Sequence, residues 1–588
     1  MRFCVVKNLV SRVYFRAAQQ DNKFLCKLQE INIFLLPLRP SNYTYGIGAI
    51  FRAKNIRHQD MKIALAQLNF TVGDIKTNTT KIIAAINEAK QQGADLAVFA
   101  EFAVSGTPAY GLLTKTTFLT LCEEAVETIA NHCKGIAAIV GTPYLTAEGP
   151  ISAAAYIDAC GNIEYIGKRY VTARREMGYI VGSSIGSQTI RIKDSNLRVV
   201  VGDDLSRMHE IDEDIDAIIS INARRYGKGI MSRRFEKMSR LAFSEGTNLV
   251  LMNQVGGSGD IVYDGTSGIL NSEGRLVMLL DSFKEDMRIF DTEAENKPFD
   301  VPLTTYNDRT RMIYEAACLG TRDYFHKNGY TKACIGLSGG IDSAVVACIA
   351  VGAFGKENVR VLLMPSPFTP NDSVEDAKRL AENLGVEYSV LPIIEAYNAI
   401  VGTLQPVIGG TEFDATEENI QTRIRTTMLM ALQNKTGYML LNSSNKSENA
   451  LGWCTLYGDT SGTFSPTGDL YKGEIYDLAR YINATFGDVI PDAIIDKEPS
   501  SELRPNQKDS DHLPHYEVID AILFRMIEKK QHREEIINAG FDSAVVEKIH
   551  KMVMENEKKR YQFPPVLRLS PCAFGHEWLM PLVNHYCD

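Results

Sequence analysis

Short apolar runs alternate with amphipathic stretches between residue 61 and about residue 300 of this chain. The compact apolar runs predict strands at 62–70, 94–102, 135–144, 198–204, 216–223 and 248–257. Helices are expected at 77–93 and 118–133, where apolar residues recur with the period of one helix face. Strands that alternate with helices indicate a layered α/β core.

A second α/β unit follows a polar stretch at 291–310, which we interpret as a linker between domains. The pattern after it predicts, in order, a helix, a strand, a Gly-rich turn, a helix, a strand, a helix and a strand. With 588 residues, the chain exceeds the size at which one hydrophobic core keeps growing. We therefore expect domains at 61–290 and 311–588. Residues 1–60 are basic and irregular, and we expect a poorly ordered extension there.

Composition narrows the class of protein. A formal net charge of -9 argues against a general nucleic-acid-binding protein. No apolar run is long enough for a membrane span, so no membrane partner is expected. The eleven cysteines form no CxxC pair and no regular spacing with histidine, which argues against a disulfide framework or a zinc site. A reducing cytoplasm is the expected compartment.

The strongest chemical signal is GLSGGIDS at 336–343, between an apolar strand at 332–337 and an apolar helix at 343–354. Successive glycines let backbone N–H groups converge on an anion, and the helix N-terminus adds its positive dipole end. The motif is neither GxxxxGK[ST] nor GxGxxG, which disfavours a kinase-type or dinucleotide-binding loop. A phosphate group is expected here, and a Gly-rich turn that only caps a helix is the alternative.

Five further motifs follow in the C-terminal half: ENIQTRIRTTMLM, LLNSSNKSENALGWCTLYGD, YKGEIYDLARYIN, PSSELRPNQKDSDHLPHYEVID and KRYQFPPVLRLSPCAFG. The loop resembles the PP-loop of the N-type ATP pyrophosphatases. Together, the motifs over 311–588 resemble the NAD+ synthetase family. The resemblance implies a doubly wound parallel sheet, ATP and Mg²⁺ as cofactors, and amidation of deamido-NAD+.

The resemblance assigns roles to residues of this half. The expected ATP-binding residues are Gly336, Leu337, Ser338, Gly339, Gly340, Ile341, Asp342, Ser343 and Ser443. Asp342, Ser343 and Lys472 are expected to act in catalysis, with Lys472 stabilising phosphate charge. Asp342 and Glu448 are the expected magnesium ligands, since this ion prefers carboxylate oxygens. The alternatives are a solvated helix-start carboxylate for Glu448 and a surface lysine for Lys472.

The expected deamido-NAD+ site draws on the same motifs. The residues that the resemblance places there are Asn419, Arg423, Glu448, Asp459 and Arg568. Asn419 and Arg423 are spaced i, i+4 and share one face of a predicted helix, and a guanidinium suits the dinucleotide phosphates. An ion pair between Arg423 and Glu417 or Glu418 is the alternative. At position 568 the family commonly has lysine.

The N-terminal motifs MKIALAQLNFTVGDIKTNTTKI, VFAEFAVSGTPAYGLL, SAAAYIDACGNIEYIGKR and NQVGGSGDIVYDG resemble the nitrilase-like glutaminase domain of the glutamine-dependent NAD+ synthetases. The resemblance implies an αββα sandwich over about 61–290. That family hydrolyses glutamine with a Glu, Lys and Cys set, and Glu101 and Lys168 match the first two. Gly202 stands where the cysteine belongs.

Glycine has no side chain and cannot form a thioester, so glutaminase activity is not expected. Arg174 replaces a tyrosine of the family, and Arg224 replaces a serine. Two large cations in place of neutral groups should reshape or fill the glutamine pocket. The N-terminal half is then either a scaffold for folding or oligomerisation, or a site that docks a separate ammonia-supplying partner or senses a metabolite. We favour the scaffold.

The function expected from these motifs is NAD+ synthesis in two steps. ATP converts the nicotinate carboxylate to an acyl adenylate and releases pyrophosphate, and ammonia then attacks the carbonyl and expels AMP. Ammonia is expected as the nitrogen donor in place of glutamine. A homo-oligomer is expected from the resemblance alone. The alternatives are a PP-loop ligase that adenylates another substrate, as in asparagine or GMP synthetases, and a non-enzymatic scaffold.

Overall fold

Two six-stranded sheets face each other in the first half of the chain. A computed structural model describes residues 61–172, 176–207, 215–292, 308–410 and 412–584. The first sheet has the order β14-β1-β2-β3-β4-β5. Its strands are β1 (Lys62–Gln67), β2 (Leu96–Val98), β3 (Ala137–Thr146), β4 (Gly149–Ile157), β5 (Ile163–Gly167) and β14 (Asp286–Asp291).

The second sheet has the order β13-β12-β9-β8-β7-β6. Its strands are β6 (Thr189–Ile192), β7 (Ser195–Val201), β8 (Ala217–Asn222), β9 (Asn248–Asn253), β12 (Gly268–Leu270) and β13 (Leu276–Leu279). A separate hairpin pairs β10 (Val255–Ser258) with β11 (Ile261–Asp264). The predicted strand 248–257 is therefore two strands, because the chain leaves the second sheet after Asn253.

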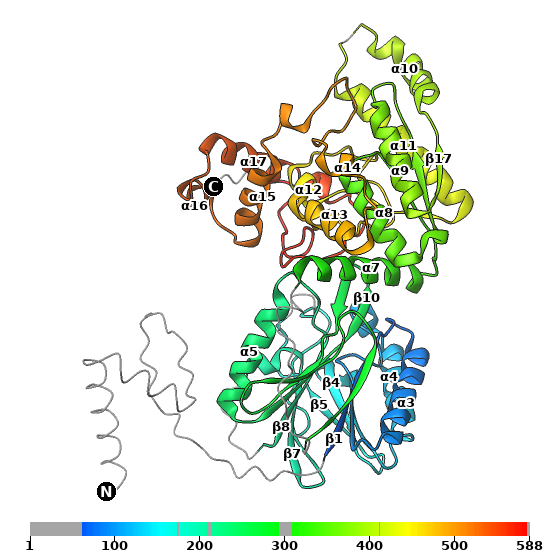
Figure 1. The fold of residues 1–588 in the computed structure, drawn as a ribbon. Coiled ribbons are helices and arrows are strands. Elements are labelled where there is room, and N and C mark those ends of the chain that lie inside the picture. The colour runs from blue at the N-terminus through cyan, green and yellow to red at the C-terminus, as the bar shows by residue number, and fades with distance from the viewer. Residues whose placement is uncertain (1–60, 173–175, 208–214, 293–307, 411, 585–588) are drawn as a thin grey trace, which may run out of the picture. The chain divides into compact units, whose positions relative to one another are not determined.

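Helices α3 (Ile75–Gln91) and α4 (Thr116–Ala130) cover the first sheet, and α5 (Ile230–Glu245) covers the second (Figure 1). One apolar cluster fills the space between the sheets with residues such as Ile63, Val98, Val199 and Ile219. Another lies between the first sheet and its helices and includes Ile86 and Val126. The predicted αββα sandwich is confirmed.

The second half begins with α7 (Arg309–Lys327), which packs on β10, β11 and α8 (Ile341–Phe354). Its parallel sheet has the order β17-β16-β15-β18. The strands are β15 (Ala333–Gly336), β16 (Val359–Leu363), β17 (Glu387–Val390) and β18 (Met439–Leu440). The strand order reverses between β15 and β18. In such sheets, ligands bind beyond the carboxyl ends of the strands at this switch point.

The longer helices of this half are α9 (Asn371–Leu384), α10 (Ile394–Ile408), α11 (Ala415–Thr436), α13 (Lys472–Phe486) and α17 (Ser543–Glu555). The shorter helices are α12 (Lys446–Leu451), α14 (Asp492–Asp496), α15 (Tyr516–Leu523), α16 (Arg533–Asn538) and α18 (Glu557–Arg560). Helix α8 is apolar all round, with Ala344, Val345 and Ile349 fully buried, which suits its central place in the core.

The predicted domain limits stay predictions. Strand β14 pairs with β1 along its length and ends at Asp291, and α7 begins at Arg309. Most of the predicted linker and the whole extension at 1–60 lie outside the described residues. Among the described residues, no helix combines the length and the apolar character that a bilayer crossing requires.

Candidate functional sites in the two halves

The Gly-rich loop joins β15 to α8 at the switch point of the second sheet. Gly339 has φ +85°, and a Cβ there would lie 2.3 Å from the Ser373 carbonyl oxygen, so only glycine fits. The Ser343 hydroxyl lies 3.1 Å from the Ser338 hydroxyl and donates to the Gly340 carbonyl at 3.0 Å. These contacts brace the loop at the start of α8, and a helix N-terminus is a common place for an anion to bind.

A cavity of about 300 Å³ opens directly above this loop. It is lined by Gly336, Leu337, Ser338, Gly340, Ile341, Asp342, Ser343, Ser443, Glu448, Asp459 and Lys472, all predicted site residues. Gly339 packs against Ser373 and does not line the cavity. The structure therefore brings the predicted ATP, metal and catalytic residues to one place.

Lys472 lies between two carboxylates in this cavity. Its Nζ is 2.6 Å from Asp342 Oδ2 and 3.2 Å from Glu448 Oε1. The residue is only 3% exposed, so a surface lysine is excluded. Burial alone would lower the pKa of Lys472, but the two carboxylates outweigh it and raise that pKa above its ordinary value.

Burial raises the pKa of the Glu448 carboxyl to about 8, although the Lys472 ammonium opposes this shift. Asn445 positions both carboxylates, because its Oδ1 accepts from the Glu448 N–H at 2.9 Å while its Nδ2 donates to Asp342 Oδ1 at 2.8 Å. Glu448 is not a solvated carboxylate at a helix start, because its side chain faces Lys472. Asn445 was not among the residues expected from the sequence, although an asparagine just before a helix is an N-cap signal.

Two more cavity residues were missed. Arg425 lines the cavity and donates from Nε to the Met364 carbonyl at 3.0 Å. Burial lowers the pKa of Arg425 to about 10. Asp509 lines the same cavity, accepts from the Tyr516 hydroxyl at 2.9 Å, and has its pKa raised mainly by burial. Both residues lie within motifs that carried the resemblance. The sequence shows that they are present but does not show that their side chains point into the cavity.

Asn419 and Arg423 lie on α11 outside the lining of the cavity. Asn419 Oδ1 accepts from the Thr455 hydroxyl at 2.6 Å, and Arg423 Nε donates to the Leu456 carbonyl at 3.2 Å. Arg423 is exposed, and Glu418 pairs with Arg504 instead. The two residues therefore share a face beside the segment that also carries Asp459, as their spacing predicted.

Arg568 lies apart from both groups. It is 2% exposed, forms an ion pair with Glu577, and donates its backbone N–H to the Asp260 carbonyl of the first half at 2.9 Å. It does not line the cavity, and its assignment to the dinucleotide stays a prediction.

A second polar cluster lies in the first half. Lys168 Nζ is 3.1 Å from Glu101 Oε1 and 2.8 Å from Glu176 Oε2, and Ser152 donates to Glu101 at 2.8 Å. Lys168 and Glu101 are buried. Burial, and then the neighbouring Glu101, raise the pKa of the Glu176 carboxyl to about 7. Glu101 and Lys168 were expected at one site from the sequence. Glu176 was not expected there, because it lies in none of the motifs that carried the resemblance.

Gly202 lies against this cluster, immediately after β7. Its φ is +57°, and a Cβ built there would lie 2.8 Å from both Glu101 Oε2 and Lys168 Nζ. Position 202 is therefore the point of the backbone from which a side chain would meet the carboxylate and the ammonium together. Those two groups now occupy the space that such a side chain would need.

Arg224 also reaches this position. Its Nη2 lies 3.4 Å from the Gly202 carbonyl oxygen and 3.9 Å from Asp203 Oδ1. Burial lowers the pKa of Arg224, and Arg234 adds to this shift. The expected cation at 224 is thus in contact with position 202, whereas Arg174 lies outside the described residues.

Comparison with family models gives one match to each half. A model described as NAD synthase matches residues 313–563, and a model described as carbon-nitrogen hydrolase matches residues 62–177. Each matched segment contains one of the two polar clusters. The NAD synthase match contains Asp342, Glu448 and Lys472, and the carbon-nitrogen hydrolase match contains Glu101 and Lys168.

Whole-length relatives share both halves. The glutamine-dependent NAD(+) synthetase of Synechocystis sp. is 36% identical over 555 residues, which cover 89% of this chain and 99% of that protein. The enzyme of the same description from Acinetobacter baylyi is 35% identical over 545 residues, covering 90% and 99%.

Two solved structures agree in fold. The glutamine-dependent NAD+ synthetase from Acinetobacter baumannii, in complex with adenosine diphosphate, is 34% identical with a TM-score of 0.70, covering 90% of this chain and 99% of that chain. The glutamine-dependent NAD(+) synthetase from Cytophaga hutchinsonii has a TM-score of 0.79 at 18% identity, covering 90% and 98%, and shows the fold alone.

Proposed function

This chain belongs to the glutamine-dependent NAD(+) synthetases, and from that premise we propose that it amidates deamido-NAD+ to NAD+ with ATP, using free ammonia in place of glutamine. The single observation that carries the synthetase step is Lys472 held between Asp342 and Glu448 at the mouth of the Gly-rich loop. The structure of the Acinetobacter baumannii relative with adenosine diphosphate supports ATP as the nucleotide.

Amide formation needs activation because a carboxylate is a poor electrophile. The N–H groups at the start of α8 bind the phosphates, and the Lys472 ammonium offsets charge that develops as pyrophosphate leaves. Both groups are fixed before the reaction, the first by the loop contacts of Ser338 and Ser343 and the second by its two carboxylates. Positioning and electrostatics therefore supply most of the rate.

Magnesium fits the carboxylate pair. Asp342 and Glu448 offer oxygen ligands on the cavity wall, and among the described residues no cluster of three or more His, Cys, Asp or Glu side chains could hold a metal by itself. Mg²⁺ commonly takes one or two protein carboxylates and completes its shell with phosphates and water. We infer that these two residues hold it, where it would neutralise phosphate charge.

Asn419, Arg423 and Asp459 are the residues we propose for deamido-NAD+. The exposed guanidinium of Arg423 is available to a phosphate. Asp459 lines the ATP cavity and also accepts from the N–H of Thr455, the residue that contacts Asn419. Arg425 reaches the cavity from the same helix and is a further candidate for phosphate contact.

The nitrogen donor follows from position 202. A thioester requires a nucleophile beside the general base, and Gly202 offers none where Glu101 and Lys168 meet. Arg224 occupies the adjoining space. Glutamine hydrolysis is therefore not expected, and free ammonia attacks the adenylate to expel AMP.

A second cavity of about 960 Å³ supports entry of free ammonium into the synthetase half. It shares Tyr476, Glu498, Pro499 and Asp509 with the ATP cavity. Its acidic lining residues outnumber its basic ones, which favours a cation such as ammonium at this mouth.

We infer that the first half acts as a scaffold for the synthetase half, and we favour this role over the docking of a separate ammonia-supplying partner. The buried Lys228 and the half-buried Arg225 of the first half both contact the second half, which supports the scaffold role. A homo-oligomer is proposed from the family alone, and light scattering of the purified chain tests it.

The synthetase step is tested by substrate-dependent release of pyrophosphate from ATP. We expect release with deamido-NAD+ and ammonium, and none with aspartate or xanthylate, the substrates that other PP-loop ligases would adenylate. Release that depends on neither deamido-NAD+ nor ammonium would contradict the proposal.

A further inference from the structure

The loop that joins β8 to α5 in the first half makes a buried ion pair with the synthetase half. Lys228 Nζ lies 2.6 Å from Glu474 Oε2, and the two side chains are only 5% and 13% exposed. Charges taken out of water stay paired in one geometry, because separating them leaves an uncompensated buried charge. This pair therefore fixes the loop of one half relative to a helix of the other.

Glu474 holds the first turn of α13, the helix whose first residue is Lys472. The same Oε2 that binds Lys228 accepts from the Tyr471 N–H at 2.9 Å, and Oε1 pairs with Arg309 at 2.5 Å. Glu474 is two positions after Lys472 in the same turn, so a shift of this carboxylate moves the backbone that carries the Lys472 ammonium.

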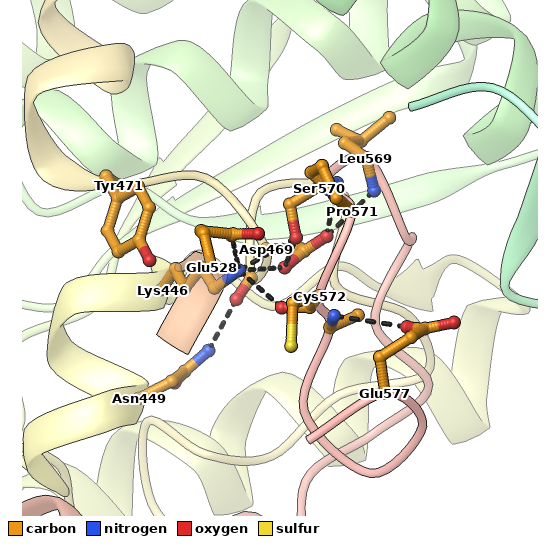
Figure 2. Close-up of polar contacts among 12 residues, drawn as sticks. Lys446, Asn449, Asp469, Tyr471, Glu528, Leu569, Ser570, Pro571, Cys572 and Glu577 are labelled. Atoms are coloured by element: carbon orange, nitrogen blue, oxygen red, sulfur yellow. Dashed lines mark hydrogen bonds and ion pairs between the residues drawn. The ribbon is translucent and has the colours of Figure 1, made fainter. Parts of the chain in front are cut away.

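The backbone of the same loop reaches the helix that carries Glu448. The Lys228 N–H donates to the Leu569 carbonyl at 2.9 Å. The N–H groups of Leu569 and Ser570 donate to Asp469 Oδ2 at 2.9 and 2.6 Å. Asp469 in turn lies 3.0 Å from Lys446 Nζ. Figure 2 shows Asp469 between Lys446 on one side and Leu569 and Ser570 on the other, with Glu528 beside Lys446.

Lys446 is the first residue of α12, two positions before Glu448. It is fully buried and lies 2.7 Å from Glu528. The Lys446 ammonium lies 5.1 Å from the centroid of the Tyr471 ring, and the Lys228 ammonium lies 5.4 Å from the same centroid. The 223–229 loop is thus tied by two short routes to the helices that carry Glu448 and Lys472.

We propose that Lys228 is a positioning residue for adenylation: through Glu474 it sets the place of Lys472, so that the half without a nucleophile takes part in the synthetase reaction. Lys228 lines neither of the two cavities, and it acts through α13. This inference rests on the adenylation step proposed above, and it is independent of the nitrogen donor.

The test measures exchange of labelled pyrophosphate into ATP by the full-length chain with Mg²⁺ and deamido-NAD+, without any nitrogen donor. Lys228→Met should lower the exchange rate constant about 10- to 100-fold, because small displacements of a catalytic group have effects of this size. The KM for ATP should change little. Lys228→Arg should restore the rate to within about threefold, since a guanidinium can pair with Glu474.

Lys327 provides the matched control. It is another largely buried lysine that joins the halves, and its Nζ donates to Asn69 Oδ1 at 2.6 Å, the Phe70 carbonyl at 2.9 Å and the Gly257 carbonyl at 2.7 Å. It lies at the end of α7 and contacts no residue of α12 or α13 in these bonds. Lys327→Met should lower Tm but leave exchange within about twofold of the parent chain.

Glu474→Gln tests the same contact from the other side, and it serves as the second variant if Lys228→Met does not fold. The double variant should be no slower than Glu474→Gln alone, because that variant already lacks the ion pair with Lys228. Equal losses in the Lys228 and Lys327 variants, or parent-level exchange in folded Lys228→Met, would overturn the inference. Absence of exchange in the parent chain would instead contradict the proposed adenylation, on which the inference depends.

Discussion

Lys472 is the residue on which the proposed synthetase chemistry depends most. Its ammonium is buried on the wall of the ATP cavity and is held in place by Asp342 and Glu448. We expect Lys472→Met to lower kcat for NAD+ formation by about 10²- to 10³-fold, as for loss of a fixed charge-stabilising donor. Steady-state assays with ammonium would measure this. A variant that folds and retains more than about a third of the parent kcat would contradict the role.

Gly202 gives a prediction about reactivity. A side chain at 202 would meet only the flexible ends of Glu101 and Lys168, so Gly202→Cys should fold with a modest cost for the positive φ. An ammonium beside the thiol lowers its pKa and favours the thiolate. We expect Cys at 202 to be alkylated by iodoacetamide at pH 7 about tenfold faster than a thiol of ordinary pKa.

The exposed Cys160 supplies the internal control for that experiment, because mass spectrometry reports both peptides from one sample. Alkylation at position 202 no faster than at Cys160 would show that this position does not face the ammonium, and the argument for a lost nucleophile would fail. Glutamate release from glutamine should need Arg224→Ser in addition, since the guanidinium occupies the adjoining space.

The Gly-rich loop gives a prediction at the scale of an element. Gly339→Ala places a methyl group 2.3 Å from a backbone oxygen at φ +85°, so the loop must move away from Ser373. We expect a loss of at least about 2 kcal/mol in stability from the conformational strain and overpacking, measured by urea denaturation. The KM for ATP should rise as the N–H groups lose their alignment.

Gly402→Ala is the control for that variant. Gly402 lies inside α10, and no atom lies within 4 Å of a Cβ built there. This change should raise stability by about 0.5 to 1 kcal/mol and leave the KM for ATP unchanged. Equal effects of the two substitutions would contradict the special geometry assigned to Gly339.

Elements were easier to predict than orientations. The apolar pattern located strands and helices within a few residues, as at 216–223 against β8, because burial in a layered core dictates that pattern. Strand 94–102 was wrong at its end, since the sheet stops at Val98 and the chain turns to bring Glu101 inward. Glu176 was missed, because side-chain positions set by tertiary packing leave no local period in the sequence. Asn445 carried an N-cap signal, but its contact with Asp342 depends on tertiary packing and left no such signal.

At the scale of the whole molecule, the two halves form a continuous structure. One apolar cluster runs from residues of the second sheet, such as Ile218 and Leu251, through Met312 of α7 to Leu337 beside the Gly-rich loop. The two-part organisation was predictable from length and motif order. The contacts of Lys228 and Arg568 across the boundary were not, because they join positions far apart in sequence.

The most direct test of the central claim compares NAD+ formation by the purified full-length chain with ammonium chloride and with glutamine, at saturating ATP, Mg²⁺ and deamido-NAD+. Because glycine stands at position 202, from which a side chain would meet Glu101 and Lys168, ammonium should support turnover while glutamine gives a rate near the background without a donor. Glutamine-driven synthesis at a rate equal to that with ammonium would contradict the account.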